Sequence, residues 1–151
     1  MGAENVTNLR PTRDRLLSWG LNTESRCVLC SASPESRDHL FFHCPFSSAV
    51  WSSVSIRCSI VPIVDWEVSL ASLIALDQRP HIRSVILLAW QCTIYYLWAE
   101  RNGRIHRNIF RSPEQTLRLI DSTIQNRISS FRGVRPATAA SMYSFWRAND
   151  H

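Results

Sequence analysis

Three cysteines and one histidine near the amino end constrain this 151-residue chain more than any other feature. They follow the spacing C-x2-C-x8-H-x4-C and are Cys27, Cys30, His39 and Cys44. Thiolate sulfur and imidazole nitrogen are the ligands that Zn²⁺ prefers in structural sites, where four of them form a tetrahedron. The spacing therefore predicts a structural zinc site. Because protein side chains fill all four positions, no place is left for a reactive water, and the metal is not expected to be catalytic.

His43 competes with Cys44 for the fourth position, because it lies four residues after His39 and would share its face of a helix. We expect that helix to begin with Ser33 as N-cap and Pro34 at its first position. It should end near His43, because a proline follows Cys44. We favour Cys44, since a thiolate just beyond a helix end is well placed and C-x2-C…H-x4-C is a known knuckle pattern. Thiols buried without a metal are the less favoured alternative.

Several strings around these ligands resemble one known family. They are PTRDRL at 11–16, the Cys27 and Cys30 pair, DHLFFHCPF at 38–46, VW at 50–51 and WAERNGR at 98–104. Together they resemble the zinc-binding module at the carboxyl end of plant non-LTR (LINE-type) retrotransposon polyproteins, downstream of reverse transcriptase. The resemblance covers roughly residues 9–131. It implies a module that helps to hold RNA or DNA near a reverse transcriptase body. In the family further helical residues precede the first string, so this chain resembles a truncated copy.

The sequence lacks the motifs of the common catalytic classes. A reverse transcriptase needs paired aspartates to hold two metal ions, and no Asp-Asp pair occurs in the chain. A P-loop, a G-x-S-x-G elbow and an H-E-x-x-H helix are also absent from the sequence. We therefore expect no enzyme activity, even though the resemblance is to part of an RNA-directed DNA polymerase polyprotein.

All of the basic residues are arginines, and they are unevenly distributed. Residues 1–80 carry seven Arg and eight Asp or Glu, whereas residues 81–151 carry ten Arg and four acids. Arginine makes planar, two-point contacts with phosphate, so a basic half favours a nucleic-acid partner. The densest cluster, and the predicted nucleic-acid site, consists of Arg101, Arg104, Arg107 and Arg111. Arginines that only complement the dipole of a helix C-terminus are the alternative.

The apolar pattern predicts an all-α chain: a small zinc knuckle with short helices, followed by a helical hairpin or bundle. We place a zinc-binding module at 9–55, a helical region at 65–131, and weakly ordered tails at 1–8 and 132–151. A short helix with Tyr143, Phe145 and Trp146 is expected within residues 137–151. Helices are expected at about 12–19, 45–54, 65–76, 81–107 and 113–131. In the helix at 12–19 we expect Leu16 with Trp19 or Leu17 to face inward. In the helix at 65–76 the expected inward residues are Leu70, Leu73 and Ile74, with Ala71 as a further candidate. The clearest stripe is formed by Leu117, Ile120, Ile124, Ile128 and Phe131.

The cysteine pattern favours a reducing compartment, because the five cysteines do not form a secreted disulfide framework. Met1 to Leu9 lacks the apolar core of a signal peptide, so an intracellular location, nuclear or cytoplasmic, is expected. The most apolar run, Val85 to Ala99, is too short for a membrane span. Two alternatives to nucleic-acid binding remain open. The chain could be a protein-interaction or structural module that docks on a polymerase body, or a retroelement remnant without independent activity.

Overall fold

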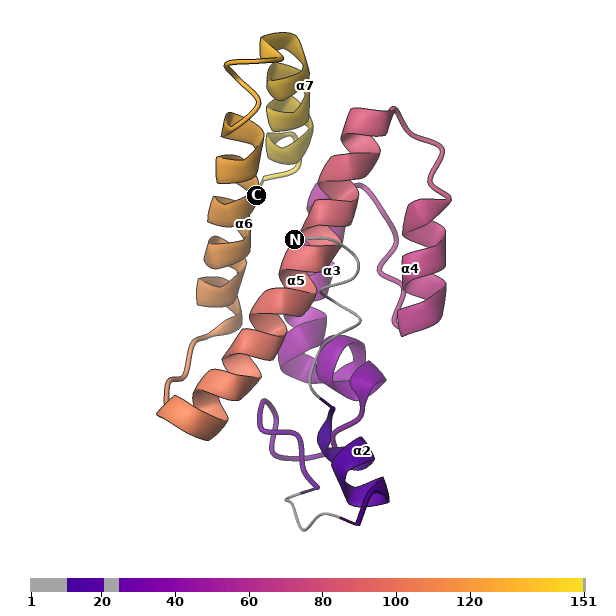
Figure 1. Ribbon diagram of the computed structural model, residues 1–151, viewed down its shortest axis with the longest axis vertical. Coiled ribbons are helices and arrows are strands. Elements are labelled where there is room, and N and C mark those ends of the chain that lie inside the picture. Colours follow the sequence, from indigo (N-terminus) through magenta and orange to yellow (C-terminus); the bar gives the residue numbers. More distant parts are fainter. Residues whose placement is uncertain (1–10, 21–24, 151) are drawn as a thin grey trace.

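The computed structural model describes residues 11–20 and 25–150, and this part of the chain is built from helices (Figure 1). The elements are α2 Arg13–Ser18, η1 His39–His43, α3 Pro45–Arg57, α4 Trp66–Ile74, α5 Pro80–Arg107, α6 Pro113–Ser129 and α7 Pro136–Arg147. Within the described residues the only β pairing is an isolated bridge between Arg26 and Pro34. The predicted all-α class is confirmed. The predicted amino-terminal tail, residues 1–8, lies outside the described residues.

The long helix α5 is the centre of the molecule. It runs diagonally through Figure 1, with α6 and α7 on one side and α4 on the other, and it also contacts α3 and η1. Its apolar side chains are buried around most of its circumference, as expected for a helix with neighbours on several sides. The buried ones include Val85, Ile86, Trp90, Ile94 and Leu97. The sequence pattern predicted this central position.

The helix α6 covers one face of α5 and follows its sequence pattern closely. Ser112 and Gln115 form a reciprocal capping box at its start. Ile120, Ile124 and Ile128 are fully buried and pack toward α5 and α3. The spacing of three and four residues therefore identified the inward face correctly.

For the helix α4 the pattern identified the inward face only in part, with Leu70 packed against the core as expected. Its N-cap is Asp65, which accepts a hydrogen bond from the Val68 N–H at 2.8 Å. Leu73 is buried as expected, but Ile74 is 58% exposed. The dominant inward residue is instead Trp66, whose ring centre lies 5.3 Å from those of both Phe41 and Trp90. One large aromatic ring at the first position of a short helix sets its rotation.

The short helix α2 is held by polar contacts rather than by an apolar face. Contrary to expectation, Leu17 is 41% and Trp19 61% exposed. The Arg13 backbone N–H donates to Glu35 Oε1 at 2.7 Å, and the Arg13 guanidinium donates to the Arg26 carbonyl at 2.7 Å. These bonds connect the start of α2 to the loop that carries the first two cysteines.

The carboxyl-terminal segment packs into the core. The short helix expected within residues 137–151 is present as α7, but the segment is not the weakly ordered tail predicted for 132–151, since Trp146 is fully buried. The Trp146 indole N–H donates to Asp121 Oδ1 at 2.8 Å. The buried side chains of the regions 9–55 and 65–131 and of α7 form one hydrophobic cluster, so the metal-ligand segment and the helices share a core.

Candidate metal centre

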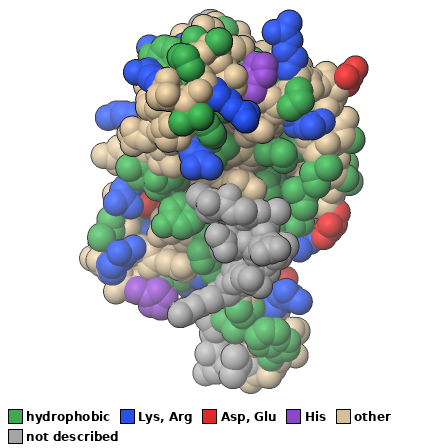
Figure 2. Space-filling model, turned by 45° about the horizontal axis from the view of Figure 1, so that its top comes forward, with side chains coloured by type: hydrophobic (Ala, Val, Ile, Leu, Met, Phe, Trp, Pro, Cys, Tyr) green, Lys and Arg blue, Asp and Glu red, His purple; other side chains and the backbone are tan. Residues whose placement is uncertain are grey.

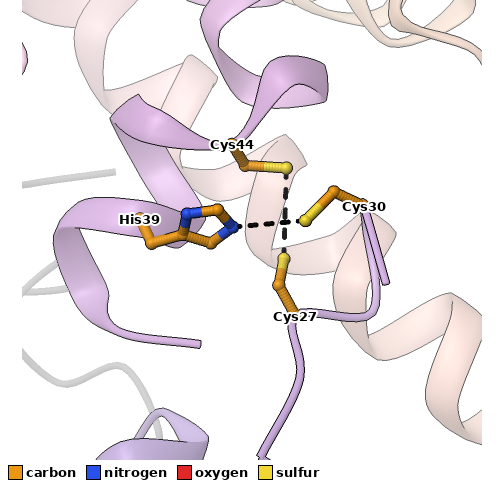
Figure 3. Close-up of side chains that lie close together, drawn as sticks. All are labelled: Cys27, Cys30, His39 and Cys44. Atoms are coloured by element: carbon orange, nitrogen blue, oxygen red, sulfur yellow. Dashed lines mark hydrogen bonds between the residues drawn. The ribbon is translucent and has the colours of Figure 1, made fainter. Parts of the chain in front are cut away.

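The four predicted ligands converge on one point (Figure 3). The Sγ atoms of Cys27, Cys30 and Cys44 and a ring nitrogen of His39 all lie within 4.8 Å of one another. Cys27 Sγ lies 4.0 Å from Cys44 Sγ, and Cys30 Sγ lies 3.3 Å from His39 Nε2. The two lines cross in Figure 3, as opposite edges of a tetrahedron do. Around Zn²⁺ such edges measure about 3.8 Å between sulfurs and about 3.6 Å from sulfur to nitrogen. The donor set therefore fits a tetrahedral metal ion.

A tight turn delivers the first two sulfurs. The Cys27 N–H donates to the Ser33 carbonyl at 2.8 Å, and the Ser31 N–H donates back to the Cys27 carbonyl at 2.7 Å. Ser31 adopts a left-handed conformation with φ of +57°, which turns the chain directly after Cys30. The bridge between Arg26 and Pro34 closes the base of this loop.

The other two ligands come from the ends of a widened helical turn. In η1 the Cys44 N–H donates to the His39 carbonyl at 2.7 Å, a five-residue step of the kind found in π-helical turns at functional sites. The turn is capped by Ser36, whose Oγ accepts from the His39 N–H at 3.1 Å. The predicted cap at Ser33 is wrong, because Pro34 belongs to the bridge and the helical residues begin after Ser36.

His43, the competing ligand, points to a different partner. Its Nε2 lies 2.9 Å from the Val64 carbonyl oxygen, and the residue is exposed. Cys44 occupies the fourth position of the cluster instead. The geometry agrees with the choice of Cys44, although metal ligation by this set stays a prediction.

The pKa values of the clustered thiols favour binding of a cation. The pKa of Cys27 is lowered to about 5, first by the hydrogen bond in which it shares a proton with the Cys44 thiol and then by the N–H groups of Cys30 and Leu29, which face its sulfur. The same shared proton, together with burial, raises the pKa of Cys44. N–H groups in the first turn of α3 also face the Cys44 sulfur and oppose that rise. Three thiols this close repel one another once ionised, and a divalent cation relieves that repulsion.

The two remaining cysteines lie apart from the cluster. Burial raises the pKa of Cys58 to about 12 and that of Cys92 to about 11. Both side chains are buried in the core, as small apolar residues would be. They are not part of the cluster that could hold a metal.

Arg104 on α5 forms hydrogen bonds with the backbone of the loop that carries Cys27 and Cys30. Its guanidinium donates to the carbonyl oxygens of Val28 and Leu29, at 3.4 and 3.2 Å, and these are the two residues between the first cysteines. It also forms an ion pair with Glu100 at 2.9 Å and donates to the Arg111 carbonyl at 3.1 Å. One side chain thus joins the metal loop, α5 and the α5–α6 connection.

Arg101 makes a second connection, to a residue that the sequence did not single out. Its guanidinium donates to both carboxylate oxygens of Glu35, each at 2.9 Å, across 66 residues of sequence. Glu35 is fully buried and also accepts the Arg13 backbone N–H. Glu35 is surrounded in sequence by serine, proline and arginine, so no apolar pattern marked it as buried.

The four arginines predicted to bind nucleic acid are therefore divided. Arg101 and Arg104 are largely buried and their guanidinium groups are bonded within the protein. Arg107 is exposed, and the Arg111 side chain is 41% exposed with Glu100 at 3.7 Å. The structure does not bring the four together as one phosphate-binding surface.

Comparison with models of known protein families gives a match over residues 4–51 to a family described as zinc-binding in reverse transcriptase. The matched segment contains all four clustered residues and covers less than half of the chain. Searches of curated proteins and of solved structures find no match. Among the described residues, none of the helices combines the length and apolarity that crossing a membrane requires. Fold and site together define a helical module with a Cys₃His cluster suited to zinc.

Proposed function

We propose that this chain is a zinc-stabilised, non-catalytic helical module that binds nucleic acid, with RNA as the expected partner. The observation that carries the proposal is the convergence of four side-chain donors, two from the cysteine turn and two from the ends of η1, within 4.8 Å of one another. The family match over the same segment supports zinc as the ion and a reverse transcriptase as the context. The motifs quoted above favour a LINE-type retrotransposon origin in a plant, and a polymerase body as a further partner.

Cys27, Cys30, His39 and Cys44 would hold the ion. When bound, Zn²⁺ supplies a cross-link, because ligation energy in a small module is folding energy. The chain's own residues do the rest: the turn at Ser31 and the wide turn η1 fix the donors, and Phe41 and Phe42 anchor η1 in the core. Since all four positions are taken by protein side chains, we propose no reaction at the metal.

The first test is metal content. The purified native chain should contain about one zinc per chain, and Cys30→Ser should lose it and unfold the segment around residues 11–54. His43→Ala is the matched control and should retain the metal, since His43 bonds to Val64 rather than to the cluster. Elemental analysis with thiol titration before and after chelation measures both. Full zinc content in Cys30→Ser, or loss of zinc in His43→Ala, would contradict the ligand assignment.

The second test is binding to RNA. The native chain should raise the fluorescence anisotropy of a labelled 20-nucleotide oligouridylate at low salt. The logarithm of the association constant should fall with the logarithm of salt concentration with a slope of about −3, as expected for four or five phosphate contacts to a single strand. No binding at 50 mM salt would exclude the nucleic-acid function while leaving the zinc assignment intact.

A further inference from the structure

A strongly basic part of the molecule lies at the amino-terminal end of α5. The predicted nucleic-acid site, by contrast, begins near the carboxyl-terminal end of that helix, at Arg101. Residues 79–99 and 122–149 contain six arginines and no aspartate or glutamate. The formal net charge of the whole chain is only +5. These two stretches cover the first part of α5, the end of α6 and all of α7, which pack together at the top of Figure 1. Together with Asp77 and Asp150, which flank the two stretches, this end carries six arginines and two acids, and so much of the excess positive charge of the chain.

Most of these arginines are available to a partner. Arg79, Arg127, Arg132 and Arg135 are exposed, and Arg83 is half-buried. None of the five has a carboxylate within 4.0 Å in the part of the chain that the structure describes. Arg147, the sixth, pairs with Asp150 at 3.3 Å and is left out. Figure 2 brings this end forward and shows arginine side chains spread among hydrophobic ones, with acidic side chains toward the edge.

A groove runs through this surface between α5 and the α6–α7 pair. It consists of two adjoining hollows of about 360 and 270 Å³, which share Ser84, Phe131 and Met142. Arg135 lines the first hollow and Arg127 the second. We call this feature the basic groove: an apolar floor that includes Phe131 and Met142, with Arg127 and Arg135 along it. The exposed Arg79 directly precedes Pro80, which lines the first hollow.

The arginines are partly oriented before any ligand arrives. The Arg127 guanidinium lies over the ring of Phe131 at 5.4 Å, and the Arg132 guanidinium lies over Tyr143 at 5.8 Å. A guanidinium held against an aromatic face keeps its N–H edge free, so less side-chain entropy is lost when it binds a phosphate.

We infer that the basic groove binds single-stranded nucleic acid, with backbone phosphates on Arg79, Arg127 and Arg135 and bases against the apolar floor. The inference rests on the proposed function and gives it a location. Charge complementarity selects an anionic partner, and arginine suits phosphate because its fork donates two parallel hydrogen bonds. A single strand uses both the charges and the apolar floor, because its bases are free to stack. A duplex or an acidic peptide would use the charges alone.

The test compares two triple variants of the full-length chain with the same change in charge. One replaces Arg79, Arg127 and Arg135 by Gln in the groove. The control replaces Arg15, Arg37 and Arg118 by Gln, all of which are exposed and line neither hollow of the groove. Binding of the labelled oligouridylate is measured by anisotropy over a salt series, after zinc content and circular dichroism are checked. Arg135→Glu alone, at an exposed position, is a second test should the groove triple fold poorly.

The groove triple should weaken binding at least 10-fold and reduce the salt slope by about 2, because three contacts to a single strand are lost. The control triple should stay within about twofold of the native chain. Equal loss in both triples, or a larger loss in the control, would overturn the groove while the nucleic-acid function stands. Failure of the native chain to bind RNA would remove the function itself. Equal displacement of the RNA by polyglutamate, or tighter binding of a duplex of equal charge, would overturn the single-strand assignment.

Discussion

At the scale of single residues, Glu35 and Arg101 form a buried ion pair that joins the amino-terminal segment to α5. The Glu35 side chain is fully buried and the Arg101 side chain is 7% exposed. The Arg101 guanidinium also lies 4.5 Å from the Trp98 ring centre. A buried pair of this kind contributes little compared with apolar packing, but the loss of one partner leaves an uncompensated charge in the interior.

Glu35→Gln should therefore lower the free energy of unfolding by roughly 3 kcal/mol or more, because Arg101 is left buried without its counter-charge. Urea denaturation followed by circular dichroism measures the change. Glu67→Gln is the matched control, since Glu67 pairs with Arg37 at 3.3 Å on an exposed surface. That variant should lose less than about 1 kcal/mol. Equal effects in the two variants would show that the buried pair has no special role.

At the scale of elements, Asp121 joins three helices. On α6 it accepts hydrogen bonds from Arg57 of α3, from Gln125 one turn later on its own helix, and from the Trp146 indole of α7. Burial alone would raise the pKa of Asp121, but these hydrogen bonds and the Arg57 charge outweigh it and lower the pKa below the ordinary 3.8. The carboxylate is thus more stable in the folded chain than in the unfolded one.

This lowered pKa predicts a pH dependence with a definite sign. Ionised Asp121 stabilises the fold above its ordinary value near 3.8, and the contribution is lost as the pH falls toward the lowered value. Asp121→Asn should therefore be less stable than the native chain at pH 6, and the difference should shrink toward pH 2. Urea denaturation across this range measures it. A difference independent of pH would indicate that packing, and not ionisation, is what the substitution removes.

At the scale of the whole molecule, the metal loop and the helices are coupled through the end of α5. Arg104 bonds the carbonyls of Val28 and Leu29 inside the loop and pairs with Glu100 on its own helix. Its guanidinium also lies 4.9 Å from the Phe46 ring at the start of α3. Residues around the ligands of a metal site orient those ligands and adjust their affinity.

Arg104→Lys should weaken zinc binding by roughly 10-fold, because lysine keeps the charge but loses the fork that holds three carbonyls and a carboxylate together. Competition with a chromophoric chelator measures the affinity. Arg107→Lys, at an exposed position on the same helix, should bind zinc as the native chain does. An unchanged affinity in Arg104→Lys would mean that the loop holds its shape without support from α5.

The sequence by itself determined what depends on short stretches of chain. The proposed ligand set lies within eighteen residues. The spacing alone therefore predicted that Cys27, Cys30, His39 and Cys44 form one cluster. The capping box at Ser112 and the repeat of Ile120, Ile124 and Ile128 likewise predicted α6 and its buried face. Hydrogen bonding within a turn and periodicity along a helix are local, and a sequence shows them directly.

Only the tertiary structure decided which charges are buried and which are free. Glu35 meets Arg101 across 66 residues, and Arg104 reaches carbonyls 75 and 76 residues away, so two arginines that resembled a phosphate-binding row hold the fold together. The same packing leaves Arg79, Arg127 and Arg135 exposed around a groove that no local pattern indicated. The physical reason is that the partner of a charge is set by which helices meet in space, and the order of residues along one helix does not record that.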